Sequence, residues 1–285
     1  MRFSLRYQAQ YRYSAAVFDQ HNALRVTPAT TPLQRVRGFR VTVEPNARTR
    51  THRDYFGTEV VEFNVPGEHE QLTITAEGEV HTEPQPAPPG ADWDALRPEA
   101  YRAAGGEFLL STGDEPANGA LAGLREEIRR EDPRATLLAV CDVIPQRFEY
   151  SPGATFVGST VDDLLEGGAG VCQDFVHLAL ILLRYEGIAA RYVSGYLFAA
   201  PENGGADSVE VDTHAWIEAL LPDAAGGGPT WVGADPTNRQ LAGETHVKIG
   251  HGRFYGDVPP IKGVYRGAGS QAEHDVAVRM TRLTS

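Results

Sequence analysis

Hydrophobic and polar residues alternate along much of the first 82 residues of the chain. The alternation runs through residues 2–13, 38–43, 59–65 and 71–80, and residues that favour turns lie between these segments. A period of two residues is typical of strands that bury one face, and no convincing helical period occurs here. Residues 1–82 are therefore predicted to form a small all-β domain of antiparallel strands, arranged like a sandwich.

A short proline-rich segment follows this domain. Residues 83–91 read EPQPAPPGA and contain four prolines and one glycine. Proline favours extended backbone and interrupts helices and central strands. The segment is therefore predicted to be a stiff linker between residues 1–82 and a second domain at residues 92–285.

The second domain shows helical periods first and strand periods afterwards. Helices are predicted at residues 92–110, 120–130, 133–145, 161–165 and 172–187, and strands at residues 190–198, 213–221, 230–233 and 273–280. Residues 199–211 are predicted to be a loop. Residues 234–269 are predicted to be mostly irregular, because glycine and proline punctuate them. The fold class is thus α+β: a domain of helices plus an antiparallel sheet, preceded by the all-β domain.

Acidic residues outnumber basic residues in this globular composition. The 285 residues include 38 Asp and Glu against 26 Lys and Arg, which gives a formal net charge of −12. Binding to nucleic acid or to an anionic membrane requires clustered basic side chains, so neither partner is expected. Six arginines do lie between positions 35 and 53, but their two-residue spacing favours one solvated strand face. Nothing in the pattern indicates an oligomeric state.

The chain has two cysteines, Cys141 and Cys172. Two cysteines make no disulfide framework, so a reducing cytoplasm is the expected location. The first residues lack the apolar core of a signal peptide, and no stretch of about 18 apolar residues could span a membrane. Cys141 lies among apolar neighbours in the predicted helix 133–145 and is interpreted as a buried core residue.

Cys172 stands in a different context. The glycine-rich turn GGAG at residues 167–170 precedes it, and apolar residues then recur every three or four positions towards Gly187. This pattern places Cys172 in the first turn of a buried helix that ends near Gly187. Free N–H groups and the helix dipole at that position favour a negative charge, so the thiolate forms more readily.

Two further residues stand at the boundaries of predicted strands. His214 opens one strand within DTHAWIEALL, and Asp235 ends the next within WVGADPTN. A hairpin between these strands would place His214 beside Asp235. A cysteine nucleophile needs an imidazole that accepts its proton and a carboxylate that orients the imidazole. The backbone N–H of Gln173 could help to stabilise an oxyanion, and Trp216 could line a substrate cleft.

Each of these residues also has an ordinary structural interpretation. A cysteine at a helix start is often structural, a histidine near a tryptophan is often simply packed, and an aspartate before proline is often a turn residue. A zinc site would be supported by spacings such as CxxC or HxxxH, which are absent, and GGAG lacks the lysine of a P-loop. The ordered combination favours a cysteine nucleophile that works without a metal or another cofactor.

The motifs GVCQDFVHLALILLRYEGIAARYVSGYL, DTHAWIEALL and WVGADPTN resemble those of the bacterial transglutaminase-like superfamily. The segments YRYSAAVFDQHNALRVTP and HVKIGHGRFYGDVPPIKGVYRG are also similar to that family, so the resemblance extends over nearly the whole chain. It implies a papain-like fold in which Cys172 is the nucleophile, His214 the general base and Asp235 the acid that orients the histidine. The chain departs from the family's frequent motifs GRDY and DxxGN at Phe254 and Thr58.

Together, these features predict a transglutaminase-like cysteine enzyme, a protease or amidase, that forms a thioester with a peptide or amide substrate. Hydrolysis is the favoured outcome, because it requires no second specific site. Transfer of the acyl group to an amine would use the same thioester, and this alternative stays open. A non-catalytic binding module is the third interpretation. It is disfavoured because Cys172, His214 and Asp235 are all present.

Overall fold

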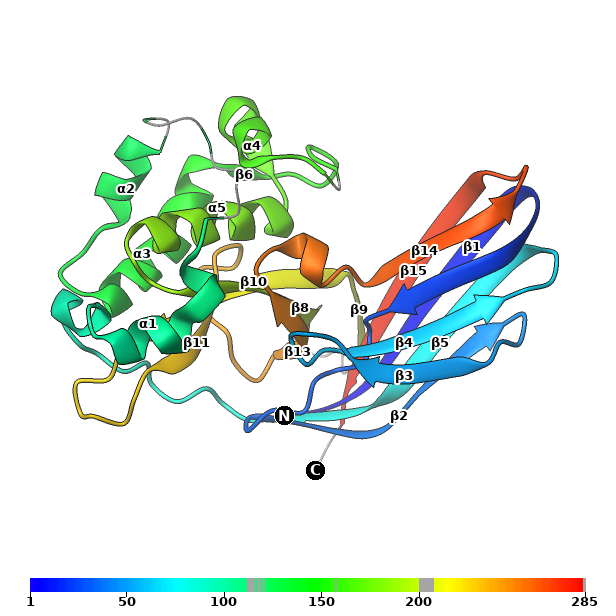
Figure 1. Ribbon diagram of the computed structural model, residues 1–285, viewed down its shortest axis with the longest axis horizontal. Helices are drawn as coiled ribbons and strands as arrows, with labels where there is room; N and C mark the ends of the chain where they lie inside the picture. Colours follow the sequence, from blue (N-terminus) through cyan, green and yellow to red (C-terminus); the bar gives the residue numbers. More distant parts are fainter. Residues whose placement is uncertain (112–115, 117–118, 120, 157, 200–207, 284–285) are drawn as a thin grey trace.

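The computed structural model describes the chain apart from residues 112–115, 117–118, 120, 157, 200–207 and 284–285. Helices gather at one end of the molecule and long strands at the other, and strands β8, β10 and β13 lie between them (Figure 1). Helices and antiparallel sheets both contribute to the fold. The predicted α+β class is therefore confirmed.

An eight-stranded sheet forms the strand-rich end. Its first five strands are β1 (Arg2–Leu24), β2 (Gln34–Glu44), β3 (Thr49–Arg53), β4 (Glu59–Val65) and β5 (His69–Thr82). β1 pairs with β5 along its first half and with β4 along its second half, both antiparallel. Alternate side chains of β1, such as Phe3 and Leu5, are fully buried in one hydrophobic core, as the alternation predicts.

Three strands from the second half of the chain complete this sheet. β14 (Ile261–Gly267) and β15 (Gln271–Arg282) pair with β1, and β9 (Ser208–Val211) pairs with β15. These residues were predicted to belong to the second domain, whereas their backbone hydrogen bonds join them to the first five strands. The division of the chain at residues 83–91 stays a prediction.

The other end of the molecule is built from helices. In the described residues these are α1 (Glu99–Gly105), α2 (Ala122–Ile128), α3 (Pro133–Arg147), α4 (Val161–Gly167) and α5 (Cys172–Tyr185), with short 3-10 helices at Trp93–Leu96, Gly106–Leu109 and Tyr255–Asp257. α3 starts where the Asp132 side chain accepts the Ala135 N–H at 2.7 Å. It ends two residues after Pro145, which is close to the predicted stop.

A five-stranded antiparallel sheet packs against these helices. Its strand order is β12 (Gln240–Leu241), β11 (Thr230–Asp235), β10 (Thr213–Leu221), β8 (Ala190–Leu197) and β13 (His246–Gly252). The two-residue strands β6 (Glu149–Tyr150) and β7 (Ala169–Gly170) form a separate parallel pair that leads into α5. This arrangement brings the start of α5 close to the sheet that carries His214 and Asp235.

The two faces of the five-stranded sheet have different neighbours. α5 packs on one face, where Ala215 and Ile217 belong to the core that the helices share. On the other face, Tyr196 and Val247 belong to the core of the eight-stranded sheet, and the Tyr196 hydroxyl donates to the Val26 carbonyl at 3.0 Å. The sheet is therefore the layer that connects the two ends of the molecule.

Two sequence predictions were wrong in part. Residues 234–269 were expected to be mostly irregular, but they contain β12, β13 and β14. β13 is buried at five of its seven positions, so it shows no alternation from which a strand could be recognised. The predicted loop 199–211 includes β9, and residues 200–207 lie outside the described part of the chain.

Within the described residues, no helix is both long enough and apolar enough to cross a membrane.

Candidate active site

A buried carboxylate organises the start of α5. Oδ2 of Asp174 accepts the Val171 N–H at 2.8 Å and the Thr155 hydroxyl at 2.6 Å. Asp174 is 2% exposed and lies in the first helical turn, where an acidic side chain also complements the helix dipole. These contacts hold the glycine turn and the first turn of α5 together, and Cys172 is the first residue of that turn.

The two cysteines lie in different environments, as predicted. Cys141 is 3% exposed within α3, and burial, followed by the charges of Asp235 and Asp142, raises the pKa of its thiol well above the usual range. Cys172 is only partly buried, and its side chain interacts with His214. Both cysteines are free thiols. Cys172 is therefore the cysteine with access to the candidate site.

His214 and Asp235 are brought together by the hairpin of β10 and β11, as the sequence predicted. Nε2 of His214 lies 2.8 Å from Oδ2 of Asp235. His214 is the second residue of β10, and Asp235 is the last residue of β11. Because Nε2 contacts the carboxylate, Nδ1 is the ring nitrogen that remains for Cys172.

Asp235 is fully buried and accepts five hydrogen bonds from other described residues. Oδ1 accepts the backbone N–H groups of Thr237 and Asn238, at 2.9 and 3.2 Å. Oδ2 accepts from the Asn238 amide at 2.8 Å, in addition to the two histidine rings. A buried carboxylate with this many donors remains ionised and cannot rotate without breaking several bonds.

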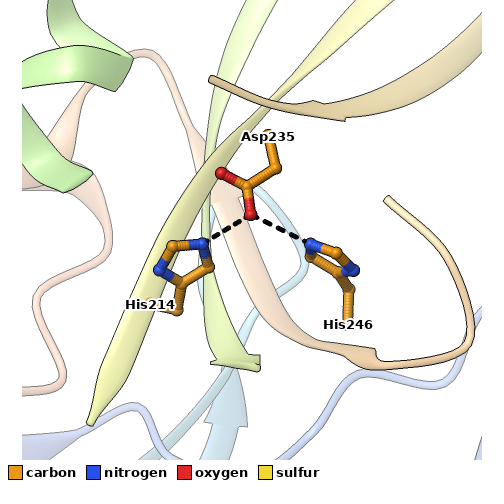
Figure 2. A group of neighbouring side chains, drawn as sticks. All are labelled: His214, Asp235 and His246. Carbon is orange, nitrogen blue, oxygen red and sulfur yellow. Dashed lines mark hydrogen bonds and ion pairs between the residues drawn. The ribbon is translucent and has the colours of Figure 1, made fainter. Parts of the chain in front are cut away.

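A second histidine, His246 at the start of β13, contacts the same carboxylate oxygen. Its Nε2 lies 3.2 Å from Oδ2 of Asp235, and its ring is on the other side of that oxygen from His214 (Figure 2). His246 was not among the site residues predicted from the sequence. It is the first residue of the motif HVKIGHGRFYGDV, so a signal was present, but this segment was predicted to be irregular.

The protonation of this cluster follows from its contacts. Burial lowers the pKa of His214, but hydrogen bonds to Asp235 and Cys172 and their negative charges outweigh burial and raise it to about 9. Burial raises the pKa of Asp235, but hydrogen bonds from both histidines and from Asn238 bring it well below its usual range. His214 is therefore positively charged and Asp235 negatively charged at neutral pH.

The donor and acceptor pattern does not fit a metal ion. His214, Asp235 and His246 place their ligand atoms within 4.8 Å of one another, close enough for one ion. However, Nδ1 of His246 accepts the Gly243 N–H at 3.2 Å and its Nε2 contacts Asp235, so both ring nitrogens already have partners in the protein. A metal-bound histidine keeps the lone pair of one ring nitrogen for the metal and donates from the other.

Gln173 and Trp216, the other two predicted site residues, lie beside these residues. Gln173 is the second residue of α5, and the intrahelical hydrogen bonds of that helix begin at Asp174 and Phe175. Its N–H therefore belongs to the unpaired first turn of a helix. Trp216 is 2% exposed, stacks beside His214 at 6.2 Å between ring centroids, and meets His246 edge-on at 5.2 Å. Trp216 thus packs against both histidines.

Comparison with known sequences identifies the family. Residues 3–81 match the family described as bacterial transglutaminase-like N-terminal region, and residues 122–236 match the transglutaminase-like superfamily. An uncharacterized protein of Mycobacterium leprae is 37% identical over 275 residues, and the match covers 96% of each chain. An uncharacterized protein of Mycobacterium tuberculosis is 34% identical over 291 residues, which cover 97% of this chain and 91% of that protein.

More distant proteins carry a functional description. A protein-glutamine gamma-glutamyltransferase from Pseudomonas aeruginosa is 27% identical over 156 residues. This match covers 50% of this chain and 23% of that protein. The crystal structure of a candidate cysteine protease from Cytophaga hutchinsonii shares the fold with a TM-score of 0.71 and 22% identity, and the match covers 98% of this chain and 90% of that one. On the family matches and the full-length relatives, the chain belongs to the transglutaminase-like superfamily and carries its bacterial N-terminal region.

Proposed function

We propose that the chain is a transglutaminase-like cysteine enzyme in which Cys172, His214 and Asp235 form a catalytic triad. The observation that carries this proposal is the position of His214 between two partners. Its Nε2 is held by the buried Asp235, and its side chain also interacts with the thiol of Cys172. A histidine placed in this way accepts the thiol proton and stabilises the resulting thiolate.

The proposed reaction cleaves an amide through a thioester. The Cys172 sulfur attacks the carbonyl carbon, and the oxygen of the tetrahedral intermediate receives hydrogen bonds from N–H groups in the first turn of α5, that of Gln173 included. His214 then donates its proton to the amine as the C–N bond breaks. Water attacks the thioester with its proton passing to His214, the C–S bond breaks, and the acid leaves.

Hydrolysis is the outcome we propose, because water is always present and needs no binding site of its own. Transfer of the acyl group to an amine is the second candidate, and the similarity to a protein-glutamine gamma-glutamyltransferase favours it. Both outcomes share the thioester, so the triad alone does not select between them. A peptide or another amide is the proposed substrate in either case. The cytoplasmic location stays a prediction.

The first experiment tests the ion pair of Cys172 and His214. The protein is treated with iodoacetamide near pH 6, where an ordinary thiol reacts slowly, and the adduct is mapped by mass spectrometry. We expect rapid modification of Cys172 and none of the buried Cys141, which serves as the internal control. His214→Gln should slow the reaction of Cys172 to that of a free thiol. Equal reaction rates in both proteins would contradict the proposal.

The second experiment separates hydrolysis from transfer. Peptides that contain glutamine are incubated with the enzyme, with and without an excess of a primary amine. We expect acid as the main product in both cases, and Cys172→Ala should form neither acid nor amine adduct. Product that contains the amine at the expense of the acid would establish the second candidate. Activity that survives in Cys172→Ala would rule out the covalent mechanism.

A further inference from the structure

A cavity lies next to the candidate active site, and Trp216 and His246 belong to its lining. It has a volume of about 650 Å³, which is within the usual range for sites that bind small molecules. We call it the interdomain cavity, because its walls come from the loops at residues 29–34 and 56–58, from the linker at residues 85–89 and from β8, β10, β11 and β13. Its described lining residues do not include Cys172, His214 or Asp235.

Three charged side chains meet in the wall formed by the sheet. The Lys248 ammonium lies 2.8 and 2.6 Å from the two carboxylate oxygens of Glu218, and the Arg191 guanidinium lies 2.6 Å from one of them. These side chains are only 13–15% exposed. Removing charged groups from water costs free energy. Buried charges therefore cluster at functional sites, and their position at a cavity indicates a binding role.

The cavity carries a net positive charge, although the protein as a whole is acidic. Among the described residues that line it, three are cationic and two are acidic: Arg53, Arg191 and Lys248 against Glu83 and Glu218. Burial, and then the charges of Lys248 and Arg191, lower the pKa of His251 to about 3, so this lining histidine is neutral. The sum of +1 would be balanced by one anionic group.

A donor group is available for such an anion. In the described part of the chain, the hydrogen bonds of the Lys248 ammonium go to Glu218, so one of its three N–H groups can serve a ligand. A ligand carboxylate in the cavity would accept this remaining N–H.

The rest of the wall is apolar and aromatic. Trp216, Trp231 and Phe56 line the cavity, and the Arg191 guanidinium lies 4.0 Å above the ring of Trp231. Large flat side chains beside a buried charge suit a ligand with an apolar body and a single charged end. A free inorganic anion would leave most of this surface without contacts.

We propose that the interdomain cavity binds a small organic carboxylate. The carboxylate lies against Lys248 and Arg191, and the apolar body packs on Trp216 and Trp231. This proposal does not depend on the catalytic role of Cys172, because the charged groups that carry it, Lys248, Arg191 and Glu218, do not belong to the proposed triad.

Phenylacetate is a suitable probe, with phenylethanol as its neutral counterpart and phenethylamine as its cationic one. Binding to the full chain is measured by isothermal titration calorimetry and by the fluorescence of the tryptophans in the wall. We expect phenylacetate to bind and phenylethanol to bind at least about tenfold more weakly, because a hydrogen bond to a charged group is lost. Equal binding of the two, or no binding of phenylacetate at about 10 mM, would overturn the proposal.

Two substitutions in the cavity should act in opposite directions. Lys248→Met reduces the net charge and should weaken phenylacetate binding at least about tenfold, whereas Glu218→Gln increases the charge and should strengthen binding. Lys262→Met, an exposed site on β14, removes the same charge outside the cavity and should change nothing. If the Lys248→Met variant does not fold, the Glu218→Gln variant tests the proposal by itself. A Glu218→Gln variant that binds phenylacetate no more tightly than the wild-type protein would contradict the proposal.

Discussion

Asp235 is the residue on which the candidate site depends most. It holds His214 in one orientation, and His246 contacts the same oxygen from the other side (Figure 2). Asn238 and the Thr237 N–H also donate to this carboxylate. A triad described by three residues therefore omits the contacts that fix the carboxylate. Among these contacts, His246 is a positioning residue, because it holds Asp235 and takes no part in the proposed bond-making steps.

His246→Ala tests this positioning role. The substitution removes one hydrogen bond to Asp235, so we expect kcat to fall about tenfold with little change in KM. His246→Gln keeps an N–H donor and should recover most of the activity. Steady-state kinetics and the pH dependence of Cys172 alkylation are the measurements. Equal losses in the two variants would show that His246 acts through packing alone.

The raised pKa of His214 also makes a prediction about stability. A histidine whose pKa rises on folding stabilises the native state fully below its unfolded pKa of 6.5, and this contribution is lost as the pH rises through about 9. The loss should be on the order of 3 kcal/mol, since each pKa unit corresponds to about 1.4 kcal/mol.

Urea unfolding between pH 6 and pH 10 measures this effect, with His214→Gln as the reference protein. We expect the difference in unfolding free energy between the wild-type protein and the variant to decrease as the pH rises through that range. A difference that stays constant with pH would show that His214 does not change its pKa on folding.

At the level of elements, the first turn of α5 determines where Cys172 lies. Asp174 joins that turn to the preceding backbone at Val171 and to the loop at Thr155. α4 offers a comparison, because Asp163 occupies the corresponding third position and accepts the Thr160 N–H at 2.7 Å. Both helices thus begin with the same type of acidic cap, but only α5 carries the cysteine.

Asp174→Ala should therefore affect both stability and activity. Loss of the cap and of two hydrogen bonds should cost about 1–2 kcal/mol of unfolding free energy. Because Cys172 then lies in a frayed turn, we also expect alkylation near pH 6 to slow. Asp163→Ala is the matched control, and it should leave the reactivity of Cys172 unchanged. If both variants react like the wild-type protein, the cap serves stability alone.

Elements with a clear period could be predicted, and elements without one could not. The helix at Cys172 was recognised because apolar residues recur every three or four positions, and its observed bounds are Cys172–Tyr185. β13 was missed because it is mostly buried between β8 and the core of the eight-stranded sheet, which removes the alternation. β9 and β12 are too short, at four and two residues, to show any period.

At the level of the whole molecule, β1 connects the two ends of the chain. Its first half lies between β5 and β15, and its second half lies between β4 and β14. The strand-rich end therefore needs residues 261–282 to pair both edges of β1. An unpaired strand edge exposes backbone groups that can pair with another molecule.

Truncation tests this dependence. We expect residues 1–82 alone to aggregate or remain unfolded, because one edge of β1 lacks its partners and half of its hydrogen bonds. A chain that ends at residue 260 should also lose the strand-rich end, and circular dichroism and urea unfolding would show this. A fragment 1–82 that unfolds cooperatively as a monomer would instead support the division of domains predicted from the sequence.

The pattern of residues by itself determined the local features of this protein: alternating strands at the start, a buried helix that opens on Cys172, and a hairpin that brings His214 to Asp235. Each of these features depends on contacts between residues that are close in sequence or joined by one turn. The spacing of hydrophobic residues along the chain reflects such contacts directly. Only the tertiary structure decided which distant strands complete the eight-stranded sheet, that His246 supports Asp235, and that a charged cavity lies beside them. These features depend on contacts between segments that are far apart in the sequence. Such contacts impose no fixed spacing on hydrophobic and polar residues, so the pattern along the chain does not reveal them.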